Sequence, residues 1–150
     1  MPLEKQIIEA LPYKEPFLFV DSLSQVGEEG ITGAYTLKEN EYFYQGHFEG
    51  NPITPGVILI EIAAQIGLVC LAINQLITED KRGAYLPTFS QAEVNFLSPV
   101  LPGEKVTVVS EKVYFRFRKL KCKFKMYNEE EQIVCEGYLS GFIVPKTNSN

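Results

Sequence analysis

The stretch that most constrains the fold is an apolar run, residues 57–77, that follows Thr54, Pro55 and Gly56. Drawn as a helix, the run is aliphatic on every side, so it must lie in a protein core or cross a membrane. Thr54 has an N-cap side chain and Pro55 suits the first helical position, which predicts a helix start here. One carboxylate, Glu61, interrupts the run and shares a helix face with Gln65. A buried carboxylate is rare unless it is paired or functional.

Composition decides between a core and a membrane for this helix. The chain has 150 residues, 45% hydrophobic and 22% charged, which is the range of one globular domain with a substantial core. Polar residues within the run, together with the lack of basic flanks close to both ends, disfavour a membrane span. We therefore predict a single domain, residues 1–150, with this helix in its core.

Charge and cysteine content exclude several classes of function. The net charge of −5 disfavours nucleic-acid binding, which requires a basic surface. The three cysteines are widely spaced and form no CxxC pair, which is typical of reduced thiols in a cytoplasmic protein. One histidine and scattered cysteines make no metal site, and no glycine-rich nucleotide loop is present. The N-terminus lacks the apolar segment of a signal peptide.

The remaining chain is predicted to be mostly strands. Alternating apolar residues and turn signals predict a short helix and six strands. The predicted ranges are a helix at 3–10 and strands at 17–26, 31–37, 89–96, 105–117, 120–127 and 132–144. Hairpin connections favour an antiparallel sheet wrapped around the one long helix, an α+β architecture.

Several ordered motifs resemble the bacterial 3-hydroxyacyl-[acyl-carrier-protein] dehydratases, which have the hot-dog fold. The resemblance covers residues 11 to about 142. The similar segments are Leu11-Pro12 with Pro16-Phe17-Leu18 and Val20-Asp21; Asn40-Glu41 with Phe43 and Gln45-Gly46-His47-Phe48; Gly50, Pro52 and Pro55-Gly56-Val57 with Glu61 and Ala64-Gln65; and Phe96 with Pro99-Val100 and Pro102-Gly103.

The resemblance implies a hot-dog dimer with two active sites at the subunit interface. His47 of one subunit and Glu61 of the other would share each site, and dimers would be able to assemble further into a trimer of dimers. The reaction would remove water from a 3-hydroxyacyl chain on acyl carrier protein and give a trans-2-enoyl chain. No electrons move, so no cofactor is expected. Aspartate at position 61 would have indicated relatives that also isomerise the double bond, and Glu61 instead indicates simple dehydration.

Each candidate side chain suits one step of this chemistry. His47 suits the base that takes a proton from C2, because histidine is the side chain most often used as a general base at neutral pH. Burial keeps Glu61 protonated, as an acid at the C3 hydroxyl requires. The N–H of Gly56 at the helix start would receive the thioester oxygen. By the same resemblance Phe48 and Val57 belong to the substrate site. The alternatives are a structural histidine, a core carboxylate, a glycine that shapes the turn and a core phenylalanine.

A basic row is the candidate docking surface for the carrier protein. Lys121, Lys123 and Lys125 alternate with apolar residues, and Arg116 and Arg118 lie nearby. Cations on one strand face would meet an acidic carrier. The alternative is a solvated strand face protected against aggregation.

Two positions depart from the family pattern, and two other functions stay open. Tyr13 replaces a frequent histidine, and Asn95 replaces a common basic residue. The acidic turn 129–131 would not favour an acidic carrier unless it faces away. The alternative functions are a hot-dog thioesterase and a non-catalytic acyl-binding module.

Overall fold

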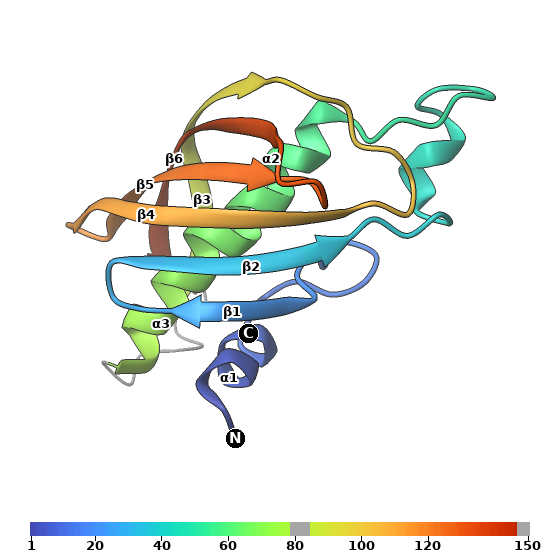
Figure 1. The fold of residues 1–150 in the computed structure, drawn as a ribbon. Coiled ribbons are helices and arrows are strands. Elements are labelled where there is room, and N and C mark those ends of the chain that lie inside the picture. Colours follow the sequence, from blue (N-terminus) through green and yellow to red (C-terminus); the bar gives the residue numbers. More distant parts are fainter. Residues whose placement is uncertain (79–84, 147–150) are drawn as a thin grey trace.

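The structure, a computed structural model, describes residues 1–78 and 85–146. It contains a short N-terminal helix, a long central helix in three consecutive parts, a one-turn helix and six strands (Figure 1). The helical elements are α1 (Leu3–Glu9), η1 (Tyr42–Gln45), α2 (Gly56–Ala64), η2 (Gln65–Val69) and α3 (Cys70–Thr78). The strands are β1 (Ser22–Val26), β2 (Gly30–Thr36), β3 (Tyr85–Phe96), β4 (Lys105–Arg116), β5 (Lys119–Tyr127) and β6 (Ile133–Pro145).

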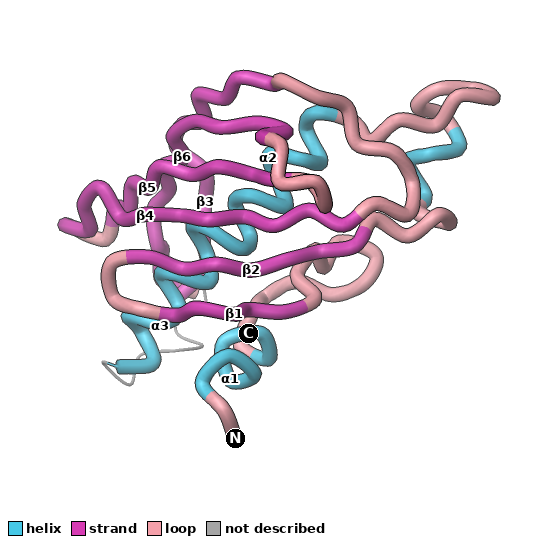
Figure 2. The backbone as a smooth tube through the Cα atoms, viewed as in Figure 1, coloured by secondary structure: helices cyan, strands magenta, loops and turns pink. Residues whose placement is uncertain are grey.

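The six strands form one antiparallel sheet that curves around the central helix (Figure 2). Their order is β1-β2-β4-β5-β6-β3, so β3 reaches the edge of the sheet although it precedes β4 in the chain. The predicted α+β architecture, an antiparallel sheet around one long helix, is confirmed. Strand β3 pairs only with β6, which leaves its other edge without a strand partner among the described residues.

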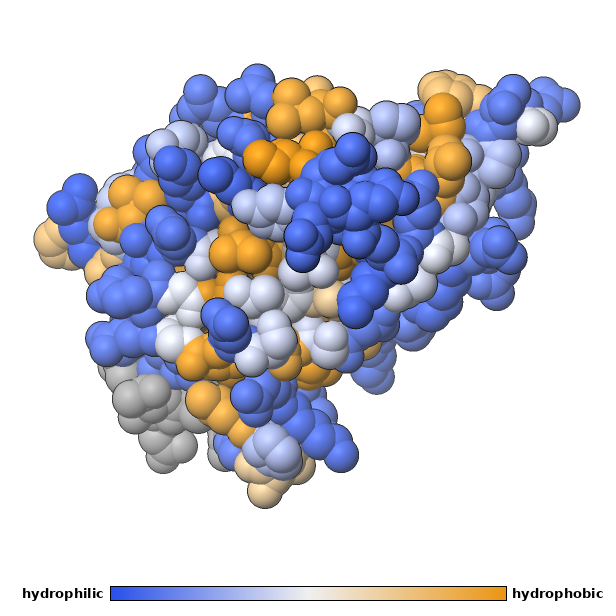
Figure 3. Space-filling view, in the orientation of Figure 1, coloured by the Kyte–Doolittle hydropathy of each residue, from blue (hydrophilic) through white to orange (hydrophobic). Residues whose placement is uncertain are grey.

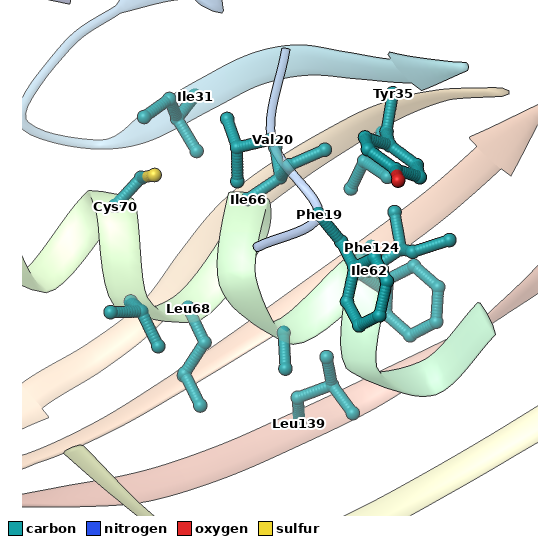
Figure 4. Close-up of a cluster of buried hydrophobic side chains, with 14 of the residues drawn as sticks. Phe19, Val20, Ile31, Tyr35, Ile62, Ile66, Leu68, Cys70, Phe124 and Leu139 are labelled. Carbon is teal, nitrogen blue, oxygen red and sulfur yellow. The ribbon is translucent and has the colours of Figure 1, made fainter. Parts of the chain in front are cut away.

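The central helix fills the concave side of the sheet. It is long and apolar enough to cross a membrane, but most of it is buried inside the protein. Its side chains pack against residues of the sheet and of the segment before β1, as Figure 4 shows for Ile62, Ile66, Leu139 and Phe19. Burial of these side chains, at about 1.5–3 kcal/mol each, is the main driving force for the fold.

Two glycines lie where the helix and the sheet are in close contact. A Cβ on Gly67 would lie 2.9 Å from the Cβ of Ser110 on β4, and the Ser110 hydroxyl donates to the Gly67 carbonyl at 2.9 Å. A Cβ on Gly33 of β2 would lie 2.8 Å from a side-chain carbon of Ile66. The middle part of the helix, η2, is a π-helical turn, an irregularity that is frequent near functional sites.

Strand β5 confirms the alternation predicted from the sequence. Its four apolar residues, Leu120, Cys122, Phe124 and Met126, are at most 2% exposed and face the helix. The lysines between them point to the other face of the sheet. Figure 3 views the molecule from the same side as Figure 1 and shows hydrophilic residues interspersed with hydrophobic ones.

The predicted strand at 17–26 is wrong in its first half. Only Ser22–Val26 pairs with another strand. The side chain of Gln65 instead bonds this segment, because it accepts from the Phe19 N–H at 2.8 Å and donates to the Phe17 carbonyl at 3.0 Å. Apolar and aromatic residues therefore line the helix here without forming a ladder.

Candidate active site

The loop that carries His47 extends beyond the sheet between η1 and α2 (Figure 1). Phe48 and Asn51 exchange two main-chain hydrogen bonds, at 3.0 and 2.9 Å, which close the tip of the loop. The Ile53 N–H donates to the His47 carbonyl at 2.9 Å. These bonds fix the backbone around the only histidine in the chain.

The imidazole of His47 is oriented by a main-chain carbonyl. Its Nδ1 lies 2.9 Å from the Ile53 oxygen, and a carbonyl only accepts hydrogen bonds, so Nδ1 carries the proton in this contact. Nε2 is then the basic nitrogen of the neutral ring. The ring stacks on Phe48 with centroids 4.1 Å apart, and Phe48 itself is 53% exposed. The arrangement presents a base with a fixed tautomer.

An open groove brings His47 next to the start of α2. Gly56 and Leu59 of the helix, Thr54, and residues 96–99 line it together with His47. A Cβ on Gly56 would lie 3.1 Å from the Phe96 ring, so glycine allows Phe96 to pack against the helix start. The first-turn N–H groups of a helix have no intrahelical partner and stabilise developing negative charge. The groove therefore combines a base with a site for an anionic oxygen.

Thr54 is not the N-cap that the sequence predicted. The helix begins one residue later, with Pro55 in the N-cap position and no side-chain cap. The Thr54 hydroxyl instead lies 2.5 Å from the Tyr44 hydroxyl, and its N–H donates to the Val100 carbonyl at 2.9 Å. Because the Thr54 hydroxyl contacts Tyr44, it does not cap the helix.

Glu61 lies one turn before the π-helical turn and is held by Gln65. The Gln65 amide donates to a Glu61 carboxylate oxygen at 2.9 Å. Gln65 is fully buried and also bonds the main chain of Phe17 and Phe19. The Gln65 amide thus links the Glu61 carboxyl group to the main chain of Phe17 and Phe19, which precede Gln65 by 48 and 46 residues.

Burial raises the pKa of Glu61 above its usual value, and the hydrogen bond from Gln65 partly opposes this rise. Burial and the nearby Glu61 carboxylate also raise the pKa of Tyr13, so its phenol stays a neutral donor at physiological pH. A carboxyl group with a raised pKa is suited to act as a general acid. The sequence predicted a buried carboxyl group, whereas Glu61 is only partly buried in the structure.

The groove of His47 and the side chain of Glu61 lie on opposite faces of the central helix. Successive residues turn by about 100°, so Glu61 is rotated roughly 200° from Leu59, which lines the groove of His47. Glu61 is not among the groove residues. One copy of the described chain therefore does not unite the predicted base and acid in one cavity.

Of the other residues predicted to bind substrate, Phe48 and Val57 are exposed near the groove, and two residues that were not predicted, Phe96 and Leu97, line it. Val57 in the first turn of α2 is 73% exposed, and Phe96 and Leu97 at the end of β3 are 48% and 59% exposed. Together with Phe48 they form an apolar surface around the start of the helix. Exposed apolar residues gathered in this way mark an interaction surface.

The basic residues proposed for docking divide into two groups. Lys123 lies opposite Glu111 of β4, and Lys125 lies opposite Glu136 of β6. Toward the β4–β5 turn the opposing residues are not acidic, because Lys121 pairs with Ser140 and Lys119 pairs with Arg116. Seven of the fourteen basic residues lie between positions 112 and 125, where no acidic residue occurs. Near this turn, the positions opposite Lys119 and Lys121 on the neighbouring strands therefore carry no acidic residue.

Thiols and metal ligands offer no second site within the described ranges 1–78 and 85–146. No three histidine, cysteine or acidic side chains there are grouped as a metal site would require. Cys70, Cys122 and Cys135 are free and buried. Burial raises the pKa of Cys122 to about 11 and that of Cys135 to about 12, which makes both poor nucleophiles at neutral pH.

Sequence reasoning did not identify the contacts that hold the two candidate groups. The contact of Tyr44 with Thr54 and the main-chain bonds of Phe17 and Phe19 to Gln65 were not predicted from the sequence. The groove residues Phe96 and Pro99 do occur in a motif that was recognised. A pair of hydroxyls ten residues apart carries no sequence pattern from which their contact would follow.

Comparison with known sequences identifies related proteins along most of the chain. The model of the ApeI-like dehydratases matches residues 23–138. The 3-hydroxyacyl-[acyl-carrier-protein] dehydratase FabZ of Caldicellulosiruptor saccharolyticus is 38% identical over 136 residues, covering 89% of this chain and 92% of that protein. The FabZ of Syntrophobacter fumaroxidans is 38% identical over 137 residues, covering 89% and 88%.

Solved structures with the same fold include dehydratases and thioesterases. The dehydratase heterocomplex ApeI:P of Xenorhabdus doucetiae aligns with a TM-score of 0.76 at 13% identity, covering 93% of this chain and 91% of that one. A mutant thioesterase of Pseudomonas aeruginosa aligns with a TM-score of 0.66 at 13% identity, covering 97% and 96%. At this identity the likeness establishes the hot-dog fold alone.

Proposed function

Because this chain belongs to the 3-hydroxyacyl-[acyl-carrier-protein] dehydratase family, we propose that it removes water from a 3-hydroxyacyl chain carried by acyl carrier protein in fatty-acid or related acyl-chain synthesis. The observation that carries the proposal is the pair formed by an oriented imidazole and a carboxyl group with a raised pKa. The whole chain acts as one dehydratase domain in the cytoplasm, and the reaction needs no cofactor.

The chemistry follows from the two groups and the helix start. Nε2 of His47 takes a proton from C2, and the N–H of Gly56 stabilises the charge on the thioester oxygen. Glu61 gives its proton to the C3 hydroxyl, which leaves as water while the C2–C3 double bond forms. Exchange with solvent then returns His47 and Glu61 to their starting protonation states. Phe48 and Val57 contact the acyl or pantetheine part of the substrate.

A second copy of the chain completes the site. Glu61 is rotated away from the groove of its own protomer, which supports a site that combines His47 of one protomer with Glu61 of its partner. The second edge of β3 has no strand partner among the described residues, and Phe89 and Phe96 on this strand are 47% and 48% exposed, so the edge needs a cover. Antiparallel pairing of two β3 edges would cover it and bring the two helices together. We propose a homodimer as the functional unit, with further assembly into a trimer of dimers.

A mixing experiment tests the shared site. His47→Ala and Glu61→Ala should each be nearly inactive alone. Unfolded, mixed equally and refolded together, half of the dimers should be mixed, so about a quarter of all sites should contain both intact groups. Activity near a quarter of wild type supports the shared site. Mixed dimers that are no more active than either variant would rule it out.

Carrier docking is proposed for two groups of basic residues. The basic turn is Arg116 and Arg118, and the lysine row is Lys121, Lys123 and Lys125. The β4–β5 turn and the loop of His47 lie at opposite ends of one protomer (Figure 1). Antiparallel edge pairing reverses the partner, so the basic turn of one protomer would lie at the same end as the partner's active-site loop. An acidic carrier would be steered there by charge.

Charge reversal separates the two basic groups. Arg116→Glu with Arg118→Glu should raise KM for a carrier-bound substrate more than the triple reversal of Lys121, Lys123 and Lys125, because Glu111 and Glu136 already oppose two of those lysines. A pantetheine thioester without the carrier serves as the control substrate, and the carrier effect should weaken as salt rises. Equal losses on both substrates would mean that these residues support the fold.

Product analysis separates dehydration from thioester hydrolysis. Carrier-bound 3-hydroxyacyl chains of several lengths should lose water and gain enoyl absorbance without release of free thiol. Free thiol without an enoyl product would instead indicate a thioesterase. Acyl binding without turnover would indicate a non-catalytic module.

A further inference from the structure

The loop from Tyr44 to Thr54 is closed at three levels. At its tip, Phe48 and Asn51 exchange main-chain hydrogen bonds of 3.0 and 2.9 Å. At the middle level His47 and Ile53 are joined by the Ile53 N–H and by the imidazole, both at 2.9 Å. At the base, the hydroxyls of Tyr44 and Thr54 lie 2.5 Å apart. His47, the proposed proton acceptor, therefore lies between the two closed ends of this loop.

The bond at the base differs from the other two in its surroundings. Tyr44 is 7% exposed and Thr54 is 4% exposed, whereas Phe48 and Asn51 lie at the surface. The base bond joins two side chains and roots the loop inside the protein. Thr54 is also fixed to the neighbouring segment, because its N–H donates to the Val100 carbonyl.

This bond lies close in the chain to two groups that the proposed chemistry uses, the imidazole of His47 and the N–H of Gly56. Tyr44 precedes His47 by three residues, and Thr54 precedes Gly56 by two. Joining Tyr44 to Thr54 therefore sets the separation between the imidazole and the first N–H groups of α2. A displacement of about 1 Å in such a site lowers a rate by as much as 10²-fold.

The two hydroxyls depend on each other. A buried hydroxyl without a hydrogen-bond partner is costly, so a movement that separates Tyr44 from Thr54 leaves both groups unsatisfied. Burial also raises the pKa of Tyr44, so its phenol remains protonated and able to donate. The pair has a defined length and direction that an apolar contact would lack.

We propose that Tyr44 and Thr54 form a positioning clamp, a buried hydroxyl pair that holds the imidazole of His47 in register with the start of α2. Its effect on rate rests on the proposed dehydratase function, whereas its effect on the imidazole does not. Thr54 also lines the groove, but its hydroxyl is engaged by Tyr44, so the pair acts through the position of His47.

Isosteric substitutions break the clamp with little change of shape. Tyr44→Phe and Thr54→Val should each lower kcat about three- to tenfold with KM changed less than twofold. The double variant should be no slower than the slower single variant, because the shared bond is already lost. Thr54→Ser keeps the hydroxyl and should retain the wild-type rate. Tyr42→Phe is the matched control, since Tyr42 lies in the same turn and is 49% exposed.

The single histidine provides a readout that a merely structural bond would not move. At about pH 9, above the usual histidine range, ¹H–¹⁵N spectra of His47 report which ring nitrogen carries the proton. Wild type, Thr54→Ser and Tyr42→Phe should show the Nδ1–H tautomer that donates to the Ile53 carbonyl. Tyr44→Phe and Thr54→Val should show a mixture of tautomers.

The outcomes separate the clamp from the function. Folded Tyr44→Phe and Thr54→Val proteins with the wild-type tautomer and wild-type kcat would overturn the clamp. A wild-type protein without dehydratase activity would overturn the function, while the tautomer spectra would still decide on the clamp. If Thr54→Val does not fold, Thr54→Cys supplies a weaker hydrogen-bonding group. Its tautomer spectrum should lie between that of wild type, which Thr54→Ser shares, and that of Tyr44→Phe.

Discussion

The loop that carries His47 and the helix that carries Glu61 hold their functional side chains by contacts of very different range. His47 is bonded to Ile53, six residues away, in a loop whose base is joined by Tyr44 and Thr54, and Thr54 is also bonded to Val100. Glu61 is bonded to Gln65 on the same helix, but Gln65 depends on Phe17 and Phe19, which lie 48 and 46 residues away. The proposed base is thus placed by a local loop, and the proposed acid by tertiary packing.

This difference indicates how each group is kept accurate. A half-exposed loop needs many short-range bonds, because few apolar contacts fix it. A buried helix is already rigid, so one amide is enough to orient the carboxyl group. The comparison predicts that weakening the support of Glu61 costs global stability, whereas weakening the support of His47 costs mainly rate.

The largest expected effect comes from removing the functional groups themselves. Glu61→Gln keeps the shape and hydrogen bonding of the side chain but not its proton, so the dehydration rate should fall by about 10²-fold or more. His47→Gln should cause a loss of similar size. Melting temperatures measured beside the rates should change little in both variants. A Glu61→Gln enzyme with wild-type turnover would reduce Glu61 to a core residue.

A second experiment compares the two supports directly. Gln65→Leu leaves the Phe17 carbonyl and the Phe19 N–H without their partner and should reduce the free energy of unfolding by about 1–3 kcal/mol. Tyr44→Phe should reduce it by less while affecting His47. Denaturant unfolding of both variants measures the contrast, and equal destabilisation would remove the distinction between the two regions.

Gln65→Leu should also change the pH dependence of activity. The hydrogen bond from Gln65 lowers the pKa of Glu61, so its loss should raise that pKa and keep the acid protonated to higher pH. The ratio of variant to wild-type kcat/KM should therefore rise with pH. A ratio that stays constant from acid to alkaline pH would show that Gln65 does not tune Glu61.

The smallest effect is a pH-dependent stability difference. The folded-state pKa of Glu61 lies above its unfolded value because of burial, so folding favours the protonated carboxyl group. This contribution is fully present below the unfolded pKa and is lost as pH rises through the folded pKa. Glu61→Gln has no carboxyl group at this position, so it does not lose this stability as pH rises. Its melting temperature relative to wild type should thus be higher at about pH 8 than at about pH 4, and the opposite trend would contradict a raised pKa.

Local patterns in the sequence were enough for much of the fold. The apolar run after Pro55 became the central helix, because a helix that is apolar all round has no stable place except a core. The alternation in β5 predicted correctly which residues face that helix. The segment 17–21 failed, since aromatic and branched residues suit both a strand and a loop that lines a helix.

For the candidate site, the sequence by itself determined the chemical groups and the family. Three residues stand out by their type within motifs of fixed spacing. They are the single histidine His47, the glycine at the helix start, Gly56, and the carboxylate within the apolar run, Glu61. The helical repeat alone also places Glu61 away from Leu59. These conclusions depend on residue type and on periodicity, which are local properties.

Only the tertiary structure decided how those groups are held. Thr54 reads as an N-cap, yet its hydroxyl bonds Tyr44, and Gln65 bonds a segment that the sequence assigned to a strand. Both outcomes arise because a buried polar group takes whichever partner the packing brings within reach. That choice depends on residues far apart in the chain, and no local pattern encodes it.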